Sequence, residues 1–135
     1  MGARGYTQTS QLSHPPKLAV PAGQTRYVVS KVIGVSASSS LNFSLFIDVE
    51  DVIVGVGETI KCYLQQFDGE SWGDVGAPQA LVTVDAGDGT YCIFLSIGVE
   101  AEALVLPLTS QVRVAIETGA TSTCSVTRIT TFDRT

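Results

Sequence analysis

A single antiparallel β-sandwich of about seven or eight strands, of jelly-roll type, is the fold that the residue pattern of this chain predicts. Apolar and polar residues alternate with a period of two through much of the sequence after Gly23, which is typical of strands with one buried face. Glycine-rich and Asp-Gly turns separate these segments at near-regular spacing. With 135 residues, the chain is long enough for one domain with a core of its own.

Residues 1–24 are predicted to form an extended arm, and residues 25–135 to form the sandwich. Glycine, serine and proline interrupt the arm, and Pro15-Pro16 favours polyproline geometry. Such a terminal segment is expected to contribute little to folding. Deletion of residues 1–20 is therefore expected to leave the fold intact and to weaken any docking.

The strands are expected to follow in chain order. Clear alternation predicts Leu41–Val49, Thr59–Leu64 and Val112–Glu117. Segments rich in β-branched residues predict four more, at Tyr27–Ile33, Leu81–Val84, Tyr91–Ile97 and Thr123–Ile129. Turns are expected at Gly55/Gly57, Asp68-Gly69, Gly73–Gly76, Asp88-Gly89 and Gly119.

Charge is distributed unevenly along the chain. Residues 1–47 carry four basic residues and no acidic one, whereas residues 48–135 carry 13 acidic and four basic residues, a net charge of −9. The basic leading segment is expected to lie against an acidic partner surface. The acidic balance of the whole chain, −5, argues against nucleic acid as a partner.

Cysteine usage predicts a protein that assembles in a reducing compartment. Cys62, Cys92 and Cys124 are odd in number and widely spaced, so buried free thiols are expected, with one disulfide or a zinc site as the alternatives. Residues 1–16 lack the apolar region of a signal peptide, and no run approaches the roughly 18 apolar residues of a membrane span. No membrane partner is expected.

No residue pattern predicts an enzyme, a cofactor or a metal. His14 is the only histidine and lies in the arm, where it is poorly placed to act as a base. Residues 85–90 resemble a calcium loop but fit a hairpin turn better, because further oxygen ligands are missing. Residues 55–61 lack the Gly-Lys-Ser/Thr order of a phosphate-binding loop.

Five features of residues 40–130 together match a known type of protein: the segments Leu45–Val49 and Ile60–Gln66, the "DG-x-x-W-x-D" hairpin at Asp68–Val75, Gly89-Thr90-Tyr91, and the closing pair Ser110–Thr118 and Thr121–Thr130. In these features the chain resembles small β-sandwich virion proteins of tailed bacteriophages, and most of all capsid decoration (cement) proteins. The resemblance implies a non-enzymatic subunit on the capsid surface of a virion, assembled in the host cytoplasm. Its partner would be the major capsid protein, and we expect a homo-oligomer, preferably a trimer.

Two alternatives to decoration remain open. Related sandwiches serve as tail, neck or fibre-base subunits of virions. A carbohydrate-binding module is the other alternative, and it would require a platform of exposed aromatic side chains.

The basic arm has no counterpart in the resemblance, so its role is inferred from its residues. An extended arm of this length reaches on the order of 70 Å, enough to bridge neighbouring subunits. The residues expected to dock are Arg4, Tyr6, His14, Pro15, Pro16, Lys17 and Arg26.

Overall fold

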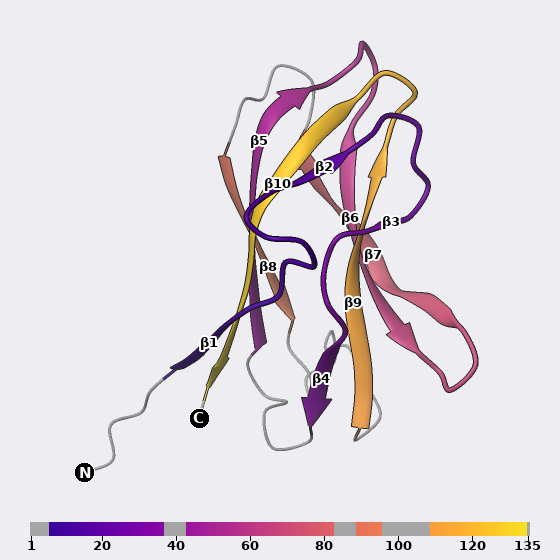
Figure 1. Cartoon of the computed structure of the whole chain (residues 1–135). Helices are drawn as coiled ribbons and strands as arrows, with labels where there is room; N and C mark the ends of the chain where they lie inside the picture. The colour runs from indigo at the N-terminus through magenta and orange to yellow at the C-terminus, as the bar shows by residue number, and fades with distance from the viewer. Residues whose placement is uncertain (1–5, 37–42, 83–88, 96–108, 135) are drawn as a thin grey trace.

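The protein is a sandwich of two antiparallel five-stranded sheets in the computed structural model, which describes residues 6–36, 43–82, 89–95 and 109–134 (Figure 1). One sheet has the order β1-β10-β5-β8, with β2 also on β10, and the other has the order β3-β9-β6-β7, with β4 also on β9. The strands are β1 (Tyr6–Ser10), β2 (Leu18–Val20), β3 (Tyr27–Val28), β4 (Ile33–Ser36), β5 (Phe43–Ile53), β6 (Ile60–Phe67), β7 (Trp72–Val82), β8 (Gly89–Leu95), β9 (Thr109–Thr118) and β10 (Thr123–Arg134).

The chain crosses repeatedly from one sheet to the other after β4, which is the connectivity of a jelly roll. The predicted antiparallel sandwich is therefore confirmed. Its eight strands β3–β10 agree with the seven or eight expected of residues 25–135. We call the sheets the β5 sheet and the β6 sheet after the long strand near the middle of each.

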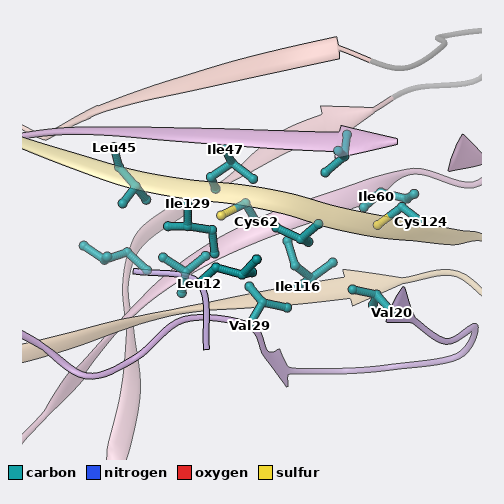
Figure 2. Packing of buried hydrophobic residues seen from close by; sticks show 14 of the residues in the cluster. Leu12, Val20, Val29, Leu45, Ile47, Ile60, Cys62, Ile116, Cys124 and Ile129 are labelled. Carbon is teal, nitrogen blue, oxygen red and sulfur yellow. The ribbon is translucent and has the colours of Figure 1, made fainter. Parts of the chain in front are cut away.

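Period-two alternation places apolar side chains between the sheets. β6 pairs with β9 along its whole length, from Ile60 opposite Thr118 to Phe67 opposite Gln111. The inward residues of both strands are almost fully buried, whereas Lys61 and Glu117 on the outer face are partly exposed. The hydrophobic core, of which Figure 2 shows the larger part, consists of Leu12, Val20, Val29, Ile33, Leu45, Ile47, Val49, Ile60, Cys62, Leu64, Val112, Val114, Ile116, Cys124, Val126 and Ile129.

Two of the three cysteines have the predicted character. Cys62 and Cys124 are free and buried in the core (Figure 2). Burial away from water raises the pKa of the Cys62 thiol to about 12 and that of Cys124 to about 11. Both therefore stay protonated near neutral pH and pack as small apolar side chains.

The hairpin between β6 and β7 is closed by Asp68 and Gly69, as predicted. One carboxylate oxygen of Asp68 accepts hydrogen bonds from the backbone N–H groups of Glu70 and Ser71, at 2.8 Å each. Gly69 has a φ of 106°, a conformation that favours glycine. The turn predicted at Gly73–Gly76 is wrong, because these residues belong to β7, in which Gly73, Asp74 and Val75 pair with β6.

The separation of residues 1–24 from the sandwich needs correction. β1 and β2 both pair with β10, and the side chains of Leu12 and Val20 are only 2% and 1% exposed. Leu12 is a single apolar residue between Gln11 and Ser13, and Val20 ends a run of only three apolar residues before Pro21, so neither gave a periodic signal. They nevertheless fill the core, and the part of the arm from β1 onward belongs to the domain.

The link between β1 and β2 also closes one side of the sandwich. The backbone N–H of Gln11 donates to Ile129 O of β10 at 2.7 Å, and that of Ser13 donates to Val29 O at 3.0 Å. Lys31 N–H in turn donates to Gln11 O at 2.8 Å. Residues 11–13 thus join β10 to the 29–31 segment. The strand predicted at Tyr27–Ile33 is divided here into β3 and the start of β4.

The side chain of Thr118 links β9 to the connection between β2 and β3 by two hydrogen bonds. We expect loss of its hydroxyl to lower the free energy of unfolding by about 1–3 kcal/mol. The buried hydroxyl donates to Pro21 O at 2.8 Å and accepts from Gln24 N–H at 3.0 Å. Thr118→Val keeps the shape of the side chain but leaves both backbone groups unpaired. Urea unfolding should show this loss of stability, and a Thr118→Val protein as stable as wild type would contradict it.

Candidate functional site

Residues predicted to dock occupy separate parts of the surface. His14, Pro15 and Pro16 are exposed side by side in the turn between β1 and β2. Tyr6 opens β1, where its backbone is opposite Arg134, and Arg4 lies outside the described residues. The turn is thus a part of the predicted arm that is exposed to solvent.

Lys17 forms ion pairs with two acidic residues of its own domain. Its Nζ lies 2.8 Å from Glu50 Oε1 and also binds Asp51, both at the end of β5. The hydrogen bond to Asp51, and to a smaller extent the one to Glu50, raises the pKa of Lys17 above its ordinary value. The predicted role of Lys17 as a free basic anchor for a partner is therefore not supported.

Arg26 is likewise engaged, on the outer face of the β6 sheet. Its Nη2 lies 2.7 Å from Asp74 Oδ2, and its guanidinium lies over the Tyr63 ring at 3.3 Å from the centroid. A second ion pair joins Arg26 Nη1 to Glu117 at 3.3 Å. The hydrogen bond from Arg26 lowers the pKa of Asp74. Arg26 and the 14–17 turn therefore do not form one docking site.

A continuous network of side chains crosses this outer face. Gln65 Nε2 donates to Asp74 Oδ1 at 3.1 Å, and Gln65 Oε1 accepts from Arg113 Nε at 2.9 Å. The Arg113 guanidinium in turn lies 4.2 Å from the centroid of the Trp72 ring. Trp72 also packs against Phe67, with centroids 5.3 Å apart. We call the set Arg26, Tyr63, Gln65, Trp72, Asp74 and Arg113 the outer-face network.

Arg113 differs from Arg26, the other cation of this network, in having no carboxylate partner among the described residues. Burial lowers the pKa of Arg113, although it remains a cation at any ordinary pH. The sequence contained a partial signal. Arg113 is the charged residue within an alternating strand, and Trp72 lies in the hairpin of the resemblance, but nothing along the chain connected them.

The aromatic residues of this face do not form an open platform. A guanidinium covers the ring of Trp72 and another covers that of Tyr63, whose side chain is buried. A sugar-binding platform requires exposed ring faces. The described part of the β6 sheet therefore does not favour the carbohydrate-binding alternative.

Loops at one end of the sandwich are joined by Glu58. Its carboxylate accepts hydrogen bonds from Thr121 N–H at 3.1 Å, from the Thr121 hydroxyl at 3.0 Å and from the Ser122 hydroxyl. Gly119 permits this approach, because a Cβ there would lie 2.6 Å from Glu58 Cδ. Glu58 thus links the β5–β6 and β9–β10 connections, which meet at the same end in Figure 1.

Stability is expected to fall as the pH drops below about 4.5. Hydrogen bonds from the Ser122 hydroxyl and, to a smaller extent, from Thr121 lower the pKa of Glu58. Hydrogen bonds from the backbone N–H groups of Ser71 and Glu70 lower the pKa of Asp68. A carboxylate whose pKa is lower in the folded state contributes stability above its unfolded pKa and loses it as the pH falls through the folded one.

Glu58→Gln should lower the stability at pH 7 and flatten this dependence. Urea unfolding between pH 7 and pH 2.5 measures it, with Glu70→Gln, at the exposed hairpin tip, as the matched control. An equally steep decline in wild type and Glu58→Gln would contradict the assignment.

Within the described ranges, no helix is long and apolar enough to cross a membrane. Over the same residues, no group of three or more His, Cys, Asp or Glu side chains is placed to bind a metal ion.

The site and fold define a jelly-roll sandwich with a charged and aromatic outer face. No family model and no curated protein matches this chain. Among solved structures, the chain is similar to the one described as "Structure of Eiger TNF from S. frugiperda", with 11% sequence identity and a TM-score of 0.46. The match covers 98% of this chain and 94% of that chain. The jelly-roll assignment itself follows from the strand order of the two sheets.

Proposed function

We propose that this protein is a non-enzymatic virion subunit that binds the outer surface of a tailed-phage capsid and stabilises the shell. The observation that carries the proposal is the β6–β7 hairpin. The "DG-x-x-W-x-D" residues, one of the segments that carry the resemblance to decoration proteins, build a turn capped by Asp68, with Trp72 and Asp74 on one outer face. The hairpin projects beyond the rest of its sheet in Figure 1, where a partner can reach it.

The physical character of the sandwich supports this role. Ion pairs join connecting segments to strands that are far away in the sequence, such as Arg26 with Asp74 of β7 and Lys17 with Glu50 of β5. A decoration subunit needs such a preorganised surface, because side chains that are already ordered lose little entropy on docking. Repeated weak contacts on a lattice then add up through multivalency.

Copy number tests the proposal and separates it from the tail or neck alternative. Quantitative mass spectrometry of purified virions should find hundreds of copies, in a fixed ratio to the major capsid protein. A dozen or fewer copies would place the protein in the neck, tail or fibre base. The absence of the protein from virions would reject a structural role altogether.

A further inference from the structure

The strongest unassigned feature is the side chain of Arg113 on the outer face of β9. Its Nε donates a hydrogen bond to Gln65 Oε1 at 2.9 Å, and its guanidinium carbon lies over the ring of Trp72, 4.2 Å from the centroid. Within the described residues, neither Nη atom donates a hydrogen bond and no carboxylate forms an ion pair with the group. The side chain is half-buried, so this cation is partly dehydrated, and the described part of the chain gives it no carboxylate at ion-pair distance.

Neighbouring groups hold Arg113 in place rather than neutralise it. Gln65, only 5% exposed, is held in turn by Asp74, and Asp74 is paired with Arg26. Asp74 is thus committed to Arg26 and Gln65. The guanidinium is therefore held through its Nε and by the Trp72 ring, while no hydrogen bond within the described residues uses its two Nη groups.

We infer that Arg113, stacked on Trp72, is the anchor that binds a carboxylate of an acidic segment of the shell protein. Two Nη groups of one guanidinium match the two oxygens of a carboxylate, and such bidentate pairs are among the strongest hydrogen-bonded contacts. Arginine and tryptophan are also the residues that most often dominate protein–protein binding energy. Only the naming of the shell protein as the source of the carboxylate rests on the proposed function.

Trp72 provides a direct reporter, since it is the only tryptophan of the chain and lies against the guanidinium. The full-length protein is titrated with a tetraglutamate peptide while Trp72 fluorescence is followed, and a tetraglutamine peptide serves as the neutral probe. Tetraglutamate should give a saturable change that weakens as salt is added, and tetraglutamine should give none.

Two variants define the site. Arg113→Gln should reduce the affinity for tetraglutamate about tenfold or more. The matched control is Arg128→Gln, which removes an arginine paired with Asp48 at 2.7 Å on the outer face of the β5 sheet, and it should bind as wild type does. Thermal unfolding checks that both variants fold. No saturable change with tetraglutamate, or equal binding by Arg113→Gln, would overturn the inference.

Binding of the same variants to shells that lack the protein separates this inference from the proposed function. Loss of shell binding in Arg113→Gln but not in Arg128→Gln supports both. Equal shell binding by all three proteins rejects Arg113 as the anchor. Peptide binding that depends on Arg113, together with no shell binding by wild type, rejects the proposed function and leaves the carboxylate site in place.

Discussion

Deletion of residues 1–20 is expected to abolish cooperative folding. The deletion removes β1 and β2 and takes Leu12 and Val20 out of the core. Full burial of each such side chain contributes about 1.5–3 kcal/mol. The same deletion leaves the edge of β10 without its partner strands. These losses are large against a total stability of about 5–15 kcal/mol for a domain.

Circular dichroism, thermal unfolding and size-exclusion chromatography would measure the effect. A smaller version of the same test is Leu12→Ala, which should cost about 2–5 kcal/mol because it opens a cavity in a packed site. Val32→Ala is the matched control, since Val32 is 53% exposed, and its change should be within about 0.5 kcal/mol. A deletion variant that unfolds at the wild-type temperature would show that the segment is a separate arm after all.

Truncation of Ile129 is expected to give the second-largest loss of stability. Ile129 is fully buried in β10 and lies in the middle of the core view (Figure 2), and its carbonyl accepts the hydrogen bond from Gln11. Ile129→Val should cost about 0.5–1.5 kcal/mol and Ile129→Ala about 2–5 kcal/mol. Urea unfolding with an unchanged m-value would report this loss.

A double-mutant cycle then tests whether the N-terminal segment packs on β10. Leu12→Ala and Ile129→Ala are expected to be non-additive by about 0.5–3 kcal/mol, because neighbouring side chains share one cavity when both are truncated. Additive losses would mean that Leu12 and Ile129 stabilise the protein independently.

The sandwich itself was predictable, because period-two alternation is a local signal. It identified the strands at Leu41–Val49 and Val112–Glu117 within a few residues of β5 and β9. The Asp68-Gly69 turn was also local, since Asp68 accepts from the two residues that follow Gly69. The start of the domain was not predictable in this way. β1 is a short polar strand whose place depends on β10, more than a hundred residues away.

The role of the basic residues in the first third of the chain was the feature that the sequence predicted least well. The basic first third and the acidic remainder suggested an arm seeking an external acidic surface. In the folded chain, however, Lys17 pairs with Glu50 and Arg26 with Asp74, so part of the separation along the sequence is neutralised in space. Pairs of this kind depend on how the connections that carry Lys17 and Arg26 pack against the sheets, which the linear sequence does not show. Arg113 was missed because its distinguishing property appears only in the folded chain. It lies over Trp72 and is bonded to Gln65, but no carboxylate of the described residues pairs with it.

Reconstitution on the shell is the most direct test of the proposal that this protein binds and stabilises a phage capsid. Purified protein is added to mature capsids that lack it, and bound copies are counted by quantitative mass spectrometry while the capsid melting temperature is recorded. Hundreds of copies per particle with a raised melting temperature is the result that the account predicts. Absence of binding at saturating protein, with the sandwich confirmed to be folded, would contradict it.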